Sequence, residues 1–200
     1  MREFFLSLKP AIIALALMTV LLGVIYPLFM CGVGHLLFHR EASGSLFYYQ
    51  DGTVLGSEWI AQGFTKPGYF HPRPSNAGAG YDATSSSGSN LGPTAQGLSD
   101  ALTQRASAYR SENSLSSTTL VPADAITGSG SGLDPHIGVA NALLQAQRVA
   151  SARGLSLFAV QGLIKEYTEG PTLWLFGESR INVLRINLAL DKLSNPERSS

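Results

Sequence analysis

The longest apolar stretch of the chain runs from Pro10 to Gly34 and contains no charged side chain. As a helix, its roughly 25 residues would extend about 37 Å, enough to cross a hydrocarbon core of about 30 Å. The glycines and the proline within it are tolerated in a membrane, because lipid offers the backbone no better hydrogen-bond partner than the helix itself. The pattern predicts one transmembrane helix over residues 10–38, preceded by a short segment (1–9) and followed by one domain (39–200).

The charges that flank this stretch predict its orientation. Arg2 and Lys9 precede it, whereas Arg40 follows it and is offset by Glu41. Because basic residues accumulate on the cytoplasmic side of a membrane, we expect a cytoplasmic segment 1–9 and an extracytoplasmic, periplasmic domain.

Two other interpretations of the stretch stay open. A cleaved signal peptide has a shorter apolar core and a nearby cluster of small residues, but here the nearest cluster, Ala42-Ser43-Gly44, lies beyond Arg40. A lipid-modified Cys31 would follow small residues, but it follows Phe29 and Met30. The pattern favours an uncleaved anchor.

Beyond the anchor, apolar positions alternate between strand and helix periods. Leu46–Tyr49 and Thr53–Leu55 flank Asp51-Gly52, a dipeptide typical of β-hairpin turns. Apolar residues at helical spacing predict helices over 98–111, 135–153 and 156–167, and favour a helix over 181–193. Residues 58–62 are read as a third short strand, and residues 173–176 as a short buried strand or extended run. These elements predict an α+β fold: one N-terminal transmembrane helix followed by a mixed α/β extracytoplasmic domain.

The helix expected over 135–153 has clear local signals at both ends. Asp134 is predicted as its N-cap and Pro135 as its first residue, where a missing N–H costs nothing. Gly154 is the expected residue just after its end, and Ser156 is the expected cap of the next helix.

Two segments rich in Gly and Ser, near 77–97 and 127–133, interrupt these elements. A flexible linker is one interpretation of such a composition. The first segment also contains Tyr81, Leu91 and a varied Gly88–Thr94 run, which favours an ordered loop.

Charge and cysteine content narrow the function. The chain has 14 basic and 14 acidic side chains, so no basic field exists for nucleic acid. Its single cysteine, Cys31, lies in the predicted membrane helix, which leaves the domain without disulfides or thiolate metal sites.

The motifs of common enzymes are missing. No lysine follows a glycine, which excludes a P-loop, and no serine has the flanking glycines of a nucleophile elbow. Asp134 and His136 are a candidate dyad, although a capping role accounts for Asp134. His35 and His39 have the spacing of metal ligands but are more typical of a membrane interface. Glu166, Glu169 and Glu178 are interpreted as solvent-facing charges, so we predict no catalytic, metal-binding or cofactor-binding residue with an assigned role.

Several motifs, in order, resemble those of one family. They are Gly56–Phe64, Tyr69–Ser75, Gly88–Thr94, Val121–Thr127, Ser129–Ile137, Gly177–Leu184 and Asn187–Asp191. Together with the anchor, this order is similar to that of the C subunits of bacterial potassium-transporting Kdp ATPases, over nearly the whole chain. Ser87 and Trp174 stand where the resemblance leads us to expect glycine.

The resemblance implies a non-catalytic accessory subunit of a high-affinity, ATP-driven potassium import pump in the bacterial inner membrane. Its expected partners are a channel-like subunit that translocates potassium and a P-type subunit that hydrolyses ATP, with membrane lipid around the helix. The chain would bind no cofactor of its own, because the complex handles ATP and potassium. It lacks the Asp-Lys-Thr of a phosphorylated loop, since Leu193 follows Asp191-Lys192.

The resemblance also implies a role in raising the ATP affinity of the hydrolytic subunit. The weak nucleotide candidates are Ser86, Gly88, Ser89 and Asn90, which are faintly similar to the signature loop of ABC transporters. A periplasmic domain is on the wrong side of the membrane for ATP, so the effect would be indirect.

Candidate interface residues are small residues of the helix and residues of the quoted motifs: Gly23, Gly32, Gly34, Arg73, Asn90, Gly92, Pro93, Asp134 and His136. The alternative function is an independent membrane-anchored envelope enzyme or binding domain that uses Asp134 and His136.

Overall fold

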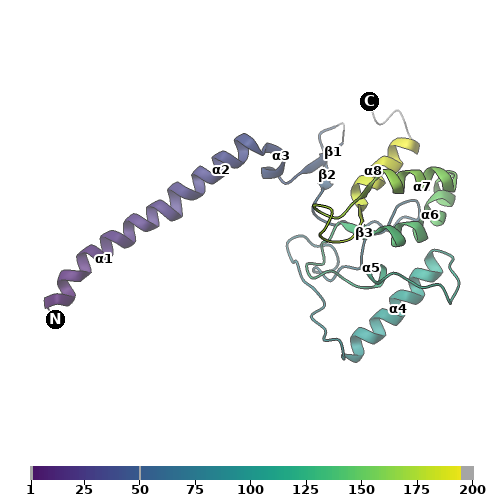
Figure 1. Cartoon of the computed structure of the whole chain (residues 1–200), viewed down its shortest axis with the longest axis horizontal. Coiled ribbons are helices and arrows are strands. Elements are labelled where there is room, and N and C mark those ends of the chain that lie inside the picture. Colours follow the sequence, from purple (N-terminus) through teal and green to yellow (C-terminus); the bar gives the residue numbers. More distant parts are fainter. Residues whose placement is uncertain (1, 50, 195–200) are drawn as a thin grey trace. The chain divides into compact units, whose positions relative to one another are not determined.

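The computed structural model describes residues 2–49 and 51–194 and divides into two compact units. The first runs through Leu46 and is helical, and the second begins at Phe47 and contains both helices and strands (Figure 1). This arrangement confirms the predicted fold class, an N-terminal apolar helix followed by an α+β region.

The first unit is one nearly continuous helix. It consists of α1 (Arg2–Val20), a π-helical turn η1 (Leu21–Ile25) and α2 (Tyr26–Leu37), followed by the short α3 (His39–Ala42). The π turn lies just before Pro27, where the amide of Tyr26 donates to the carbonyl of Leu21. Because proline has no N–H and crowds the carbonyl four residues earlier, the wider turn relieves both problems locally.

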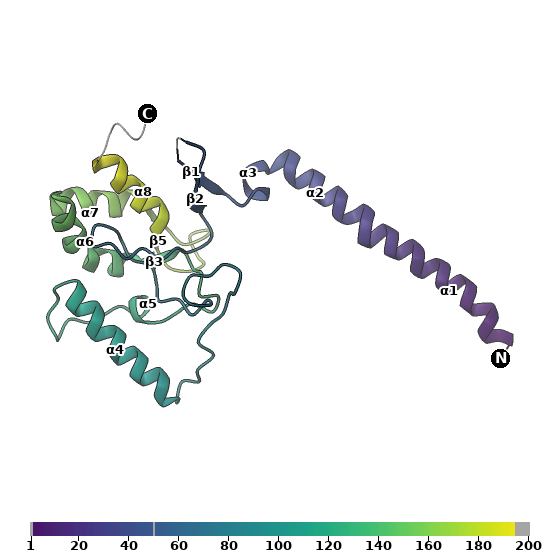
Figure 2. The same cartoon turned by 180° about the vertical axis from the view of Figure 1, so that it is seen from behind.

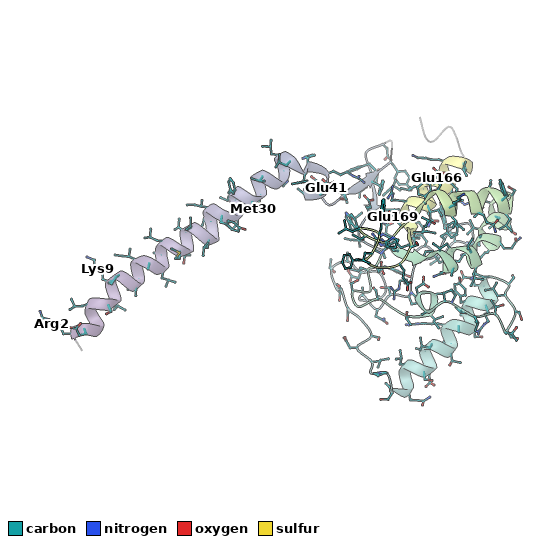
Figure 3. All side chains as sticks on the ribbon, viewed as in Figure 1. Arg2, Lys9, Met30, Glu41, Glu166 and Glu169 are labelled. Carbon is teal, nitrogen blue, oxygen red and sulfur yellow. The ribbon has the colours of Figure 1, made fainter. Side chains whose placement is uncertain are left out.

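Residues Leu6–Leu37 of this helix are long and apolar enough to cross a membrane. The most apolar 18-residue window of this stretch has a mean hydropathy of 2.5, and none of that window is buried within the chain. Arg2 and Lys9 lie towards the N-terminal end of the helix and Met30 lies within its apolar part (Figure 3). At 1.5 Å per residue the stretch is about 48 Å long, more than a bilayer core needs.

The second unit begins with a hairpin and contains a small sheet. β1 (Leu46–Tyr48) pairs with β2 (Val54–Ser57), with Gly52 at a φ of +82°, so the Asp51-Gly52 turn is confirmed. The sheet has the order β3 (His136–Gly138), β5 (Arg180–Asn182), β4 (Thr168–Glu169), and both pairings are antiparallel. The strand predicted at 58–62 is wrong, because the chain turns there instead.

Three helices enclose the core with this sheet. They are α6 (Val139–Arg153), α7 (Leu157–Glu166) and α8 (Val183–Ser194), which lie together in both views (Figures 1 and 2). Their buried faces contribute Val149, Val160, Ile186 and Leu190, and Phe70 enters the same core from an extended segment. Two further helices, α4 (Gln96–Glu112) and α5 (Ala123–Ile126), precede β3.

The start of α6 differs from the prediction. Residues 136–138 form β3, with Ile137 opposite Ile181, so the helix begins at Val139 and Asp134 is not its N-cap. Instead Asp124 accepts hydrogen bonds from the amide of Gly138 (2.8 Å) and from Asn141 Nδ2 (2.9 Å). A carboxylate from α5 thus occupies the positive end of α6.

The other helix boundaries agree with the local signals. α6 ends at Arg153 and is followed by Gly154, which has a φ of +66°. Ser156 Oγ accepts a hydrogen bond from the amide of Ala159 at the start of α7. The stretch 181–193 splits between the two patterns, because residues 180–182 form β5 and a helix follows from Val183.

The prediction of a short buried strand or extended run at 173–176 is wrong, because the chain turns there. Thr172 and Phe176 pair across a tight turn, and the four apolar residues between 173 and 176 are all exposed. Leu173 is 80% exposed and Trp174 is 94% exposed, and both have positive φ (52° and 61°). A short apolar run predicts burial only if some other part of the chain covers it.

Candidate functional site

The centre of the second unit is an extended segment, Phe70–Ser75, that is held by side chains rather than by a neighbouring strand. Asn187 of α8 accepts from the amide of Phe70 (2.8 Å) and donates to its carbonyl (2.9 Å). Gln145 of α6 does the same for His71, at 2.7 and 3.1 Å. Pro72 and Pro74 have no N–H to give to a sheet, so two buried amides take the place of a strand.

A buried polar network fixes the orientation of these amides. Asn141 Oδ1 accepts from Gln145 Nε2 (2.9 Å) and from the Tyr109 hydroxyl (2.8 Å). Arg148 donates to Gln145 Oε1 (2.8 Å) and to Asn113 Oδ1 (3.0 Å). Desolvation by burial is the main reason that the pKa of Tyr109 is raised well above its usual range, so this hydroxyl stays a donor.

Three predicted site residues meet at the end of the extended segment. Arg73 donates to Asp134 Oδ2 at 2.9 Å, and His136 donates its backbone amide to Asp134 Oδ1 at 3.0 Å, with its Nδ1 3.4 Å from the same oxygen. Arg73 also reaches the carbonyls of Thr127 and Gly128. These contacts tie the loop before β3 to the extended segment.

The electrostatics of Asp134 follow from these contacts. Burial alone would raise the pKa of its carboxyl, but the hydrogen bonds from His136 and Arg73 together outweigh burial and leave the pKa below its usual range. The carboxylate is therefore charged at neutral pH and fully engaged with its neighbours.

A groove of about 750 Å³ lies beside this cluster. Its lining includes His136 and side chains charged with both signs: Arg73, Asp124, Asp134, Glu178 and Arg180. The structure thus brings together Asp134 and His136, as a dyad would require, but it gives Asp134 a partner, Arg73, that accounts for its charge without catalysis.

The two Gly- and Ser-rich segments pack against one another. The amide of Ser87 and the hydroxyl of Ser86 both donate to the carbonyl of Ser131, at 3.0 and 2.9 Å. A methyl group on Gly132 would lie 2.6 Å from the carbonyl oxygen of Ser87, and one on Gly88 would lie 3.1 Å from that of Gly130. The glycines permit two backbones to approach closely, and the ordered-loop interpretation is confirmed.

This packing places the nucleotide candidates in two groups. Ser86 and Gly88 contact the 129–132 turn, with Ser86 still exposed to solvent, and Ser89 and Asn90 are exposed further along the same loop. Asn90 has a φ of +53°, and Gly92 and Pro93 beside it are also exposed. None of the four lines the groove beside Arg73 and Asp134.

The glycines of the first unit have open surroundings. A methyl group on Gly32 would meet nothing within 4 Å, and those on Gly23 and Gly34 would meet only Thr19 and Ala42 at ordinary contact distance. Their faces of the helix are therefore available to a neighbour.

The other candidates for metal binding or acid–base chemistry, the histidines of the first unit and the glutamates near the C-terminus, do not form a site. Among residues 2–49 and 51–194, no three His, Cys, Asp or Glu side chains are close enough together to bind a metal ion. The His35 and His39 rings lie 6.3 Å apart, and Glu169 pairs with Arg180 and Arg185.

Sequence reasoning missed the residues that organise this unit. Gln145, Asn187 and Arg148 received no role, although polar residues at 141 and 145 interrupt the apolar face of α6 at i, i+4 spacing. That interruption was the available signal for a buried polar network.

Fold and site together define a class: a membrane-associated chain with one N-terminal apolar helix and an α+β domain whose buried polar groups position loops. The chain belongs to the KdpC family, the c chain of the K⁺-transporting ATPase, whose family model matches residues 8–192. This confirms the family resemblance and the expectation of an accessory subunit of a potassium-transporting ATPase.

Curated relatives agree over nearly the full length. A potassium-transporting ATPase KdpC subunit of Mycobacterium tuberculosis (strain H37Ra) is 55% identical over 187 residues, covering 94% of this chain and 98% of the relative. KdpC subunits of Caulobacter sp. (strain K31) and Rhodospirillum rubrum are 53% and 52% identical, each covering at least 92% of both chains.

Proposed function

We propose that this chain assembles and stabilises an ATP-driven potassium import pump without catalysing a step itself. The observation that carries the proposal is the match to KdpC subunits, which covers both the apolar helix and the domain. The partners would be a channel-like subunit that translocates potassium and a P-type subunit that hydrolyses ATP.

The helix would provide the anchor. Its apolar side chains have no partner within the described part of the chain, and Gly23, Gly32 and Gly34 leave room for close approach of another helix. In lipid, small residues allow helices to pack by van der Waals contact, which is the main attraction available there. Arg2 and Lys9 would keep the N-terminus in the cytoplasm and place the domain in the periplasm.

The domain would offer loops of fixed shape to the partners. Asn90, Gly92 and Pro93 are exposed on one of the packed loops, so they are suited to direct contact. Arg73, Asp134 and His136 are partly buried and engaged with each other, so they would act by holding that surface in place.

An effect on ATP affinity would be transmitted through the complex. A subunit that binds one conformation of its partner more tightly shifts the population towards that conformation. A direct contact through Ser86 and Gly88 has less support, because the Ser86 hydroxyl already donates to the Ser131 carbonyl and Gly88 lies close to the backbone of Gly130.

An anchor exchange tests the assembly role. Residues 6–37 are replaced by an unrelated apolar helix of equal length without glycine, which keeps the chain in the membrane. We expect the other subunits to co-purify poorly with this variant and potassium uptake at limiting potassium to fall, whereas the unaltered chain retains both. Full complex formation and uptake by the exchanged variant would refute specific packing of the helix.

A further inference from the structure

The turn at residues 172–176 presents an apolar surface that nothing in the described chain covers. Leu173, Trp174, Leu175 and Phe176 are 80%, 94%, 77% and 61% exposed. Four consecutive large apolar side chains in water are costly, and a compact apolar patch with a polar rim is typical of an interaction site.

The turn is also closed by backbone hydrogen bonds. Thr172 and Phe176 exchange backbone hydrogen bonds at 2.8 and 2.9 Å, and the amides of Trp174 and Leu175 donate to the carbonyls of Pro171 and Thr172. Leu173 and Trp174 both have positive φ, a conformation that normally favours glycine or asparagine. Strained residues of this kind persist where the position of a side chain matters, and a tight closed turn loses little freedom on binding.

The charges around the turn indicate what kind of surface it fits. At the base of this loop Glu169 lies opposite Arg180, and two carboxylates share the two arginines there: Arg180 pairs with Glu169, and Arg185 pairs with both Glu169 and Glu58. Glu178 is exposed and has no ion pair or hydrogen bond among the described residues. The free charge beside the turn is therefore a carboxylate and not a cation. A negative charge is repelled by the anionic surface of a bilayer and attracted by a protein surface with basic residues.

We propose that the Leu173–Phe176 turn inserts into an apolar cleft, edged by Lys or Arg, on another subunit of the same ATPase complex. The proposal rests on the assembly role above and assigns a specific part of the domain to it. Trp174 is the expected centre of the contact, because buried tryptophans contribute disproportionately to binding.

Site-specific photo-crosslinking in membranes that contain the complete complex tests the partner. A photoreactive phenylalanine analogue replaces Trp174 in one variant and Phe158 in the control. Phe158 is 86% exposed but lies on α7. We expect a crosslink from position 174 to another subunit and none from position 158. A crosslink to lipid, a crosslink to a second copy of this chain, or no crosslink would overturn the proposal.

Trp174→Gly separates binding from folding. Glycine accepts the positive φ, so the variant should keep or raise the thermal stability of the full chain, while retention of the other subunits falls about thirtyfold. Phe158→Ala should retain them. If Trp174→Gly retains the other subunits fully, the turn is not the contact, whereas the assembly role fails only if the unaltered chain retains none.

Discussion

The backbone of Phe70 and His71 is held by two side-chain amides, and each amide makes a matched pair of hydrogen bonds. Removing one amide therefore leaves a buried N–H and a buried C=O without partners at once. The loss in free energy of unfolding then comes from the desolvation of these two groups, about 1–3 kcal/mol for each.

Gln145→Leu is expected to lower the free energy of unfolding by about 2–4 kcal/mol, because leucine fills the space but satisfies none of its partners. The melting temperature of the full chain in detergent, followed by circular dichroism, should fall by roughly 5–15 °C. Gln147→Leu, two residues along the same helix but exposed, is the matched control and should stay within about 0.5 kcal/mol. Equal losses in the two variants would contradict the role given to Gln145.

Asp134 makes the stability of the domain depend on pH. Its folded-state pKa lies below the value of about 3.9 expected for an unfolded chain, so the unfolded state binds the proton more readily. The stabilisation is then fully present above about pH 4 and is lost as pH falls through the folded-state pKa.

Asp134→Asn should remove that dependence. Between pH 7 and pH 3, the melting temperature of the variant is expected to fall less steeply than that of the unaltered chain, and it should already be lower at pH 7 because the ion pair with Arg73 is gone. Parallel pH profiles would show that Asp134 makes no net contribution. Loss of a catalytic activity without loss of stability would instead favour the enzyme alternative.

Local signals in the sequence were sufficient where the structure uses local contacts. Ser156 caps the helix that follows it, and Gly154 ends the helix before it through its own positive φ. Asp134 carried an equally good local signal, but its carboxylate binds Arg73, 61 positions earlier. The cap of α6 comes from Asp124 on another helix, which residue spacing alone does not indicate.

At the scale of elements, the two glycine-rich loops behave as one structural unit. Their composition suggested either a linker or an ordered loop, and the mutual packing of Ser86–Gly88 with 130–132 decides between them. The sequence does not indicate that the two segments are neighbours, because backbone groups and a serine hydroxyl make the contact and no charge pair or apolar pattern marks it.

A pair of glycine substitutions tests this contact. Gly132→Ala is expected to destabilise the domain by about 2 kcal/mol or more, because Gly132 has a φ of +67° and its new methyl group would lie 2.6 Å from the Ser87 carbonyl. Gly130→Ala meets nothing within 4 Å and should change stability by about 0.5 kcal/mol at most. Limited proteolysis should then cut within 77–97 in the first variant only. Equal protection of both would show that close approach of the loops is not required.

The small sheet explains why α6 and α8 each begin later in the chain than their apolar patterns predict. Ile137 and Ile181 each sit at the start of a helical pattern, yet they face each other across β3 and β5. Apolar spacing at the end of a helix also fits a short strand, and only the partner, 44 positions away in the chain, resolves the ambiguity.

At the scale of the whole molecule, the dominant feature is an apolar helix long enough to span a membrane. Helix length and apolar composition were evident from sequence because the bilayer imposes both. The side of the membrane on which the domain lies rests on Arg2 and Lys9 alone, and it also determines whether the loops can meet ATP.

Single-cysteine labelling in a Cys31→Ser background tests the orientation. We expect Ser117→Cys, at an exposed position of the loop after α4, to react with a membrane-impermeant maleimide in intact spheroplasts. Ser7→Cys, close to the N-terminal end of α1, should react only after lysis. The reverse pattern would place the Ser86–Asn90 loop in the cytoplasm with the nucleotide. A direct contact with ATP would then become possible and an indirect effect through the complex unnecessary.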